Sequence, residues 1–385
     1  MDNLNIPFNR PSIVGNELDY IKQAVRDGKI SGDGIFSKKC SELMEQKYKI
    51  KKVLLTTSCS TALDMASILI NIKDGDEVIL PSYTFVSTAN SFYMRGAKLR
   101  FIDIRKDTLN IDESKIEEAI TPQTRAIIAV HYGGVSCEMD KILNIAKKYN
   151  LYVIEDAAQG IESKYKGNYL GAMGDIGCLS FHETKNITCG EGGAILINNK
   201  KFFERAEIIR EKGTNRSKFF RGEVDKYTWV DVGSSYLPSE ILSAFLYAQL
   251  ENIGIVINSR KELWKYYYDN LEELEIEGFV RRPIVPQVCS HNGHLFYIIV
   301  GSEAVRNLLL EYLKSRGILA IFHYPPLHLS PMGRRMGYRQ GQLPVTEKIS
   351  SRLVRLPLFF GLTRSEQDTV IKNLKGFFKS KNNGY

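Results

Sequence analysis

The sequence has few cysteines, and they are not arranged as a disulfide framework or a zinc site. The six cysteines stand at positions 40, 59, 137, 178, 189 and 289, and no two form a C-x-x-C pair. Such sparse use in a chain of 385 residues is typical of reduced thiols. The six histidines contain no H-x-x-x-H pair beside an acid. We therefore expect no metal site.

Long hydrophobic runs are also missing. The longest apolar runs, such as "AIIAV" and "EVIL", fall far short of the roughly 18 residues that a membrane-spanning helix needs. The first residues, "MDNLNIPFNRPSIVG", contain no apolar leader. With 43% hydrophobic and 25% charged residues, the composition is that of a globular protein and excludes collagen, coiled coils and disorder. We expect a cytoplasmic protein with no membrane partner.

The positive charges are scattered and form no basic arm or stripe. The formal net charge is +8, but the densest stretch, residues 205 to 226, mixes seven Lys or Arg with four Asp or Glu. A solvated helix and loop would explain this stretch, and so would a small anionic substrate, which needs only a few fixed cations. No nucleic-acid partner is expected.

From about residue 50 the chain alternates short apolar segments with amphipathic ones. The apolar segments are "KKVLLTTS", "DEVILPS", "KLRFIDI", "RAIIAVHYGG", "LYVIEDAA" and "IGCLSFH", and those with helical spacing are "TALDMASILINI", "STANSFYMRG", "DESKIEEAI" and "MDKILNIAKKYN". This alternation predicts an α/β fold with a mostly parallel sheet and helices on both faces. Polar residues cluster where the strands end, and ligands of open α/β sheets bind there.

The pattern changes near Pro238, which suits the first turn of a helix. One or two long helices follow, and then a shorter alternation that includes "GHLFYIIV", "EAVRNLLLEYLKSRG" and a final helix from Ser365. We expect a large domain at residues 1–254, with an N-terminal arm, and a smaller C-terminal α+β domain at residues 255–385.

Lys185, in "SFHETKNITCGEGG", is a surface charge, a phosphate clamp or an amine nucleophile. No G-x-x-x-x-G pattern precedes it, and the glycines of "GAMGDIG" do not match G-x-G-x-x-G. Both nucleotide-loop interpretations are therefore weak. The glycines after Lys185 would instead leave the backbone room beside a bulky ligand.

Asp156 and Lys185 close successive predicted strands and lie 29 positions apart. In a parallel sheet both side chains would enter the same crevice, and an acid buried there needs a cation or a donor. Pyridoxal 5′-phosphate meets both requirements, because its ring nitrogen is protonated beside a carboxylate and its aldehyde condenses with a lysine amine.

That cofactor also needs a phosphate site and a stacking partner. "TTSCSTAL", residues 56 to 63, offers hydroxyls and N–H groups at a predicted helix start, where an anion is favoured. Ser58 and Thr61 could instead be ordinary N-cap residues. Ser180 is a further phosphate candidate. Phe85 could cover the ring, although an aromatic residue after a strand is usually part of the core.

The segments "PSYTFVSTAN", "VIEDAAQG", "SFHETKNIT", "GEGG" and "FHYPPLH" together resemble the DegT/DnrJ/StrS family of sugar aminotransferases. The resemblance covers residues 6 to about 375. It implies an aspartate-aminotransferase-like (type I) fold, pyridoxal 5′-phosphate as cofactor, and a homodimer with two shared active sites.

The resemblance also implies roles for individual residues. Lys185 aligns with the lysine that holds the cofactor covalently, Asp156 with the partner of the pyridine nitrogen, and Gln159 with the neighbour of the ring hydroxyl. Ser60, Thr61 and Ser180 match phosphate ligands, and Phe85 matches the stacking aromatic. Many members carry Gly-Tyr-Asn-Tyr-Arg, whose asparagine reaches the partner's phosphate, where this chain has Gly233-Ser234-Ser235-Tyr236-Leu237; Ser235 is the candidate replacement.

The stretch from Glu211 to Leu237 resembles members that convert dTDP-4-keto-6-deoxy-D-glucose and L-glutamate into dTDP-4-amino-4,6-dideoxy-D-galactose for surface polysaccharides. The candidate substrate residues are Lys212, Arg216, His323, Tyr324 and His328, although Tyr and His often only satisfy a packed strand end. The 4-amino-D-glucose epimer and a cofactor-binding regulator without turnover stay open. Sugar dehydratases of the same fold have histidine in place of the lysine, so Lys185 argues against them.

Overall fold

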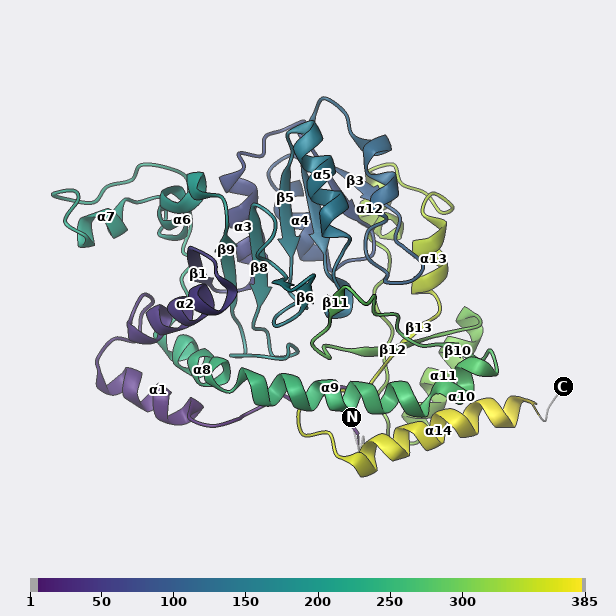
Figure 1. Ribbon diagram of the computed structural model, residues 1–385. Helices are drawn as coiled ribbons and strands as arrows, with labels where there is room; N and C mark the ends of the chain where they lie inside the picture. Colours follow the sequence, from purple (N-terminus) through teal and green to yellow (C-terminus); the bar gives the residue numbers. More distant parts are fainter. Residues whose placement is uncertain (1–5, 383–385) are drawn as a thin grey trace.

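The computed structural model describes residues 6–382, and it is built around a seven-stranded sheet (Figure 1). The strands are β1 (Lys52–Thr56), β2 (Glu77–Pro81), β3 (Lys98–Ile102), β4 (Thr124–Val130), β5 (Tyr152–Asp156), β8 (Ile176–Ser180) and β9 (Gly193–Ile197), in the order β1-β9-β8-β5-β4-β2-β3. β9 pairs antiparallel with β1 and β8, and the other paired strands run parallel. The carboxyl ends of β5 and β8 therefore meet at one edge of the sheet.

Hydrophobic residues cover both faces of this sheet, so neighbouring strand residues belong to different cores. In β5, Val153 packs into the core under α2, α5 and α8, whereas Ile154 packs into the core under α3, α4 and α6. The helices of this lobe are α1 (Glu17–Arg26), α2 (Ile35–Tyr48), α3 (Cys59–Leu69), α4 (Val86–Tyr93), α5 (Met139–Tyr149), α6 (Phe203–Arg210), α7 (Arg216–Phe220) and α8 (Glu240–Glu251). Continuous apolar strands are typical of parallel sheets with helices on both sides.

The C-terminal part forms a second, smaller layer around a three-stranded antiparallel sheet, β10-β12-β13. Its elements are β10 (Val280–Arg281), β12 (Phe296–Val300), β13 (Leu353–Leu356), α10 (Glu272–Ile276), α11 (Glu303–Ser315), α13 (Pro344–Ser350) and α14 (Arg364–Asn382). Helix α12 (Pro331–Arg335) instead lies beside β3 of the large sheet (Figure 1), where Tyr338, just after the helix, packs on Phe101. Strands β6 (Lys164–Tyr165), β7 (Asn168–Tyr169) and β11 (Cys289–Ser290) form a third small sheet.

Helix α9 (Ile253–Asn270) runs beneath both lobes (Figure 1). Its first turns, with Val256 and Ile257, pack into the large-lobe core, and its later turns, with Trp264 and Tyr267, pack into the small-lobe core. The predicted domain boundary at residues 254/255 falls at the start of this shared helix. The boundary itself stays a prediction.

The expected class, an α/β fold with a mostly parallel sheet and a smaller C-terminal domain, is confirmed. The six predicted strands are present, and the helical stretch after Pro238 is two helices, with Ser239 as the N-cap of α8. One local expectation was wrong, and one strand had not been predicted. Residues 112–120 form two 3₁₀ turns, η1 (Glu113–Lys115) and η2 (Glu117–Ala119), where a helix was expected, and β9 was not predicted.

The six cysteines are free thiols, and five of them are buried. Among residues 6–382, no group of three or more His, Cys, Asp or Glu is placed to hold a metal ion. In the same residues no single helix is long and apolar enough to cross a membrane; α8 and α9 would meet that test only together, as a pair bent by 63°.

Gly193 allows β9 to pass directly under the start of α3. A Cβ at Gly193 would lie 2.3 Å from the carbonyl carbon of Ser58 and 2.4 Å from the backbone nitrogen of Cys59. We expect Gly193→Ala to destabilise the fold by about 1–3 kcal/mol, the usual cost of overpacking, which thermal unfolding would measure.

The matched control is Gly254→Ala in α9, where the added Cβ meets no atom within 4 Å. It should be neutral or stabilise the helix by roughly 0.5–1 kcal/mol. A melting temperature of Gly193→Ala equal to that of the wild type would show that the Ser58–Cys59 backbone moves aside without loss of stability.

Candidate active site

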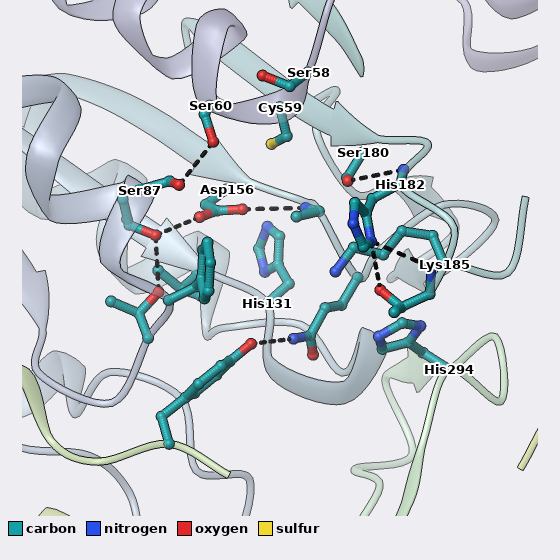
Figure 2. Close-up of a pocket in the computed structure, with 18 of the residues that line it drawn as sticks. Ser58, Cys59, Ser60, Ser87, His131, Asp156, Ser180, His182, Lys185 and His294 are labelled. Carbon is teal, nitrogen blue, oxygen red and sulfur yellow. Dashed lines mark hydrogen bonds between the residues drawn. The ribbon is translucent and has the colours of Figure 1, made fainter. Parts of the chain in front are cut away.

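A cavity of about 490 Å³ lies beyond the carboxyl ends of the parallel strands, between the two lobes. Residues from β5, β8 and the starts of α3 and α4 line it on the large-lobe side, and residues 321–324 and 355 line it on the small-lobe side. Figure 2 shows Lys185 and Asp156 entering this space from different sides. Of the predicted site residues, the cavity brings together Ser60, Phe85, Asp156, Gln159, Ser180, Lys185, His323 and Tyr324.

Asp156, the last residue of β5, is a buried carboxylate held by neutral donors. The Thr88 hydroxyl donates to its Oδ2 at 2.6 Å, and the Ala158 N–H donates to its Oδ1 at 3.1 Å. Within residues 6–382 no cation lies within 4.0 Å of this carboxylate. A carboxylate can accept about four hydrogen bonds, so Asp156 can still accept one from a positively charged N–H group.

The N-terminus of α3 faces the cavity close to Ser60 and Ser180. Ser58 accepts a hydrogen bond from the Thr61 N–H at 3.1 Å, and the Thr61 hydroxyl accepts one from the Ser58 N–H at 3.0 Å. This capping box uses Thr61 internally and leaves the N–H groups of Cys59 and Ser60 without acceptors in residues 6–382. Free N–H groups at a helix start bind anions.

Hydroxyl groups complete this anion site. Ser60 donates to the Ser87 hydroxyl at 2.7 Å, and Ser180, at the end of β8, accepts from the His182 N–H at 3.4 Å. Figure 2 shows Ser60 and Ser180 at the same end of the cavity. The arrangement suits a phosphate group.

Lys185 lies in the turn between β8 and β9, and its ammonium group has neither a hydrogen-bond partner nor a carboxylate within 4.0 Å among residues 6–382. Burial lowers the pKa of Lys185; Arg355 lowers it further, while Cys59 and Asp156 act in the opposite direction. A lowered pKa makes the neutral amine, which is both a nucleophile and a base, available nearer to neutral pH.

Aromatic residues form one wall of the cavity. Phe85 is 56% exposed, so it is not the core residue that its place after a strand suggested. Its ring centroid lies 6.2 Å from that of Tyr324, whose hydroxyl accepts from the Gln159 side-chain amide at 3.0 Å. His323 Nδ1 forms a hydrogen bond with the Tyr132 hydroxyl at 3.0 Å. Burial lowers the pKa of His323 well below its ordinary value.

Five predicted site residues lie outside the cavity lining: Thr61, Lys212, Arg216, Ser235 and His328. Lys212 and Arg216 both pair with Glu211, and Ser235 is exposed near them. His328 is fully buried, with Ser82 on its Nδ1 at 2.7 Å and Glu347 on its Nε2 at 3.1 Å. It therefore ties α13 to the end of β2.

Sequence reasoning missed several residues of the cavity, and three of them have a clear place in the site. Thr88 orients Asp156, and its place within "PSYTFVSTAN" was the only available signal. His294 donates its Nδ1–H to Asn186 at 2.8 Å, which leaves its Nε2 as an acceptor. Arg355 comes from the small lobe, and no motif singled it out.

Known proteins share this architecture. The sequence model of the DegT/DnrJ/EryC1/StrS aminotransferase family matches residues 11–375. The uncharacterized protein MJ1066 of Methanocaldococcus jannaschii is 35% identical over 377 residues, which are 96% of this chain and 97% of that protein.

Two solved structures have nearly the same fold. The aminotransferase TlmJ from Streptoalloteichus hindustanus has a TM-score of 0.90 at 25% identity, covering 98% of this chain and 100% of TlmJ. The PLP form of the putative sugar aminotransferase Spr1654 from Streptococcus pneumoniae has a TM-score of 0.89 at 24% identity, covering 98% of this chain and 99% of Spr1654. At that identity the second likeness shows the fold alone.

Lys185 should lose its proton at a lower pH than an exposed lysine. Burial disfavours the ammonium form and lowers the pKa of Lys185, whereas the Glu117 carboxylate raises the pKa of Lys148. NMR of ¹³C-dimethylated lysines across alkaline pH would measure both, with Lys185→Arg assigning the signal. Equal titration of the two lysines would show that burial does not control the amine.

Proposed function

Because the chain belongs to the DegT/DnrJ/EryC1/StrS aminotransferase family, we propose that it transfers the amino group of L-glutamate to the C4 ketone of dTDP-4-keto-6-deoxy-D-glucose. The product is dTDP-4-amino-4,6-dideoxy-D-galactose, for surface polysaccharides such as lipopolysaccharide, O-antigen or enterobacterial common antigen. The observation that carries the proposal is one cavity that holds Lys185, Asp156 and the N-terminus of α3. We expect the reaction in the cytoplasm.

The chain is an aminotransferase that uses pyridoxal 5′-phosphate, and the cavity residues fit this cofactor. The N–H groups of Cys59 and Ser60, which have no acceptor in residues 6–382, would hold the phosphate together with Ser180. Asp156 retains acceptor capacity for a protonated ring nitrogen. Lys185 supplies an unpartnered amine for the aldehyde.

In the mechanism, each residue acts on a defined atom. Pyridoxal 5′-phosphate supplies, when bound, an aldehyde that exchanges amino groups and a ring that withdraws electrons from the reacting carbon. Asp156, oriented by Thr88, would hold the proton on the ring nitrogen. Phe85 would cover one face of the ring.

Lys185 moves the proton. With the cofactor bound, the neutral Nζ of Lys185 would take the proton from the α-carbon of L-glutamate and deliver it within the cavity. The amino group would pass to the cofactor's aldehyde carbon and, with the addition of one water from solvent, 2-oxoglutarate would leave. In the second half-reaction the same amine would deliver a proton to C4 of the keto sugar, the reverse of its action on L-glutamate. The lowered pKa of Lys185 suits both directions, because a catalytic group works best when its pKa is near the working pH.

A homodimer with shared active sites is part of the proposal. Helix α7 and its flanking loops extend away from the rest of the chain (Figure 1), and they carry the exposed apolar residues Phe220 and Trp229. Exposed apolar groups of this size mark interaction surfaces. Ser235, Lys212 and Arg216 lie at the base of this projection, so we propose that they serve the partner's phosphate and the sugar nucleotide's diphosphate.

Borohydride reduction should fix the cofactor to the wild-type chain through Lys185. The peptide that contains Lys185 would then gain the mass of the reduced cofactor, as mass spectrometry measures. In Lys185→Ala we expect no such gain and a loss of roughly 10²- to 10⁴-fold in turnover, the usual share of acid–base catalysis. Lys166→Ala, which removes a surface lysine paired with Asp140, is the control; a mass gain in Lys185→Ala contradicts the assignment.

The substrate assignment predicts two products from one incubation. With L-glutamate and dTDP-4-keto-6-deoxy-D-glucose, 2-oxoglutarate should form in equal amount to an amino sugar. Proton NMR coupling constants of the sugar should show an axial C4 amine. An equatorial amine would show that the product is the 4-amino-D-glucose epimer. Absence of 2-oxoglutarate from the incubation would refute the proposed reaction.

A further inference from the structure

Arg355 enters the cavity from a rigid position in the small-lobe sheet. On β13 it lies opposite Tyr297 of β12, and on the other side its N–H donates to the Ile321 carbonyl at 2.7 Å. Its strand neighbours Val354 and Leu356 pack into the small-lobe core. Because side chains alternate along a strand, Arg355 faces the large lobe, where it lines the cavity.

The guanidinium group has no counter-ion in the described part of the chain. Neither a hydrogen bond nor a carboxylate within 4.0 Å satisfies it, and its Nε is buried without a partner. The Phe8 ring lies 4.5 Å from its Cζ and shields one face. By contrast, Arg210 is paired with Asp33 at 2.7 Å, and Arg282 with Glu275 at 2.7 Å.

An unpaired, largely buried guanidinium is costly unless an anion joins it. Its terminal nitrogens are available to the cavity, while its Cζ is fixed under the ring of Phe8. A planar fork of this kind matches a carboxylate through two parallel hydrogen bonds. The phosphate already has its own donors at the start of α3, on the large-lobe side.

The reaction places a carboxylate near this group. The α-carboxylate of an amino donor is bonded to the carbon from which Lys185 removes the proton, so it must lie close to the lysine amine. Arg355 acts electrostatically on Lys185 and on His294, which agrees with that proximity. We infer that Arg355 binds the α-carboxylate of the amino-acid donor, an assignment that rests on the proposed aminotransferase reaction.

This contact separates the two half-reactions. The keto sugar carries no carboxylate, so its amination does not use the carboxylate contact. Arg355 therefore selects the amino donor and contributes little to recognition of the sugar.

The test compares Arg355→Gln and Arg355→Lys with Arg352→Gln, which removes a nearby arginine that is outside the cavity lining. Stopped-flow absorbance of the bound cofactor follows each half-reaction alone: L-glutamate with the holoenzyme, and keto sugar with the aminated enzyme. We expect Arg355→Gln to weaken L-glutamate binding by about 100-fold, the effect of losing a paired charge-assisted contact. Arg355→Lys should lose less, and the control should match the wild type.

A binding measurement complements the kinetics. Glutarate has the carboxylates of the donor but no amine, so calorimetric titration of the holoenzyme reports binding without turnover. It should bind the wild type and Arg352→Gln, and its binding to Arg355→Gln should be weaker by a similar factor. Circular dichroism checks that each variant is folded.

Two results would overturn the inference. Unchanged L-glutamate and glutarate binding with a slower sugar half-reaction would assign Arg355 to the sugar nucleotide. Loss of cofactor retention, measured by absorbance after dialysis, with donor binding intact would assign it to the phosphate. If the wild type performs neither half-reaction, the proposed function fails, while glutarate titration still decides whether Arg355 binds a carboxylate.

Discussion

The position of the catalytic groups depends on one fully buried carboxylate, Glu155, next to Asp156 in β5. Glu155 accepts hydrogen bonds from His131 at 2.9 Å and from the N–H groups of Gly171, Met173 and Gly174 at 2.8, 2.7 and 2.6 Å. Burial alone would raise the pKa of Glu155, but these donors lower it below its ordinary value. A buried charge is tolerated only when it is satisfied in this way. The loop that enters β8 is therefore held against β5, and the strand ends that carry Asp156 and Ser180 are held in register.

The cavity contains opposite charges that the chain itself does not neutralise. Asp156 has only neutral donors, and within residues 6–382 neither Lys185 nor Arg355 has a carboxylate partner. Burying charged groups without pairing them raises the free energy of the folded protein. The rigid strands and hydrogen bonds around these groups keep them in place. A ligand that presents a cationic ring nitrogen and a carboxylate satisfies Asp156 and Arg355 at once. This is electrostatic preorganisation, in which the protein has already paid for the arrangement before binding.

The strand ends of the large lobe were predictable; on the small-lobe side His323 and Tyr324 were predicted from a motif, but Arg355 was not. Parallel strands with polar residues at their ends indicated Asp156, Ser180 and Lys185, since strand ends at one sheet edge converge. β9 was not predicted because "GAILI" follows a glycine-rich turn. The strand is also buried on both faces, so its sequence shows no alternation of polar and apolar residues. Arg355 stands 199 positions after Asp156, and nothing in "RLVRLPL" indicates which of its two arginines faces the large lobe. The glycines of "GAMGDIG" did not match a nucleotide loop, and no other role was predicted for them. They let backbone N–H groups reach Glu155, and a Cβ at Gly177 would lie 2.1 Å from the Gly171 carbonyl oxygen.

The two lobes are fixed to each other around the cavity by hydrogen bonds that cross between them. Tyr83, after β2, donates to the His323 carbonyl, Gln159 donates to Tyr324 at 3.0 Å, and Asn186, next to Lys185, donates to the Asn292 carbonyl at 3.0 Å. Because these links join residues on both walls, the distance between the Lys185 turn and β13 does not depend on a bound ligand to set it. A substrate that bridges Lys185 and the small lobe therefore meets a preformed spacing, and its length and charge pattern decide whether it fits.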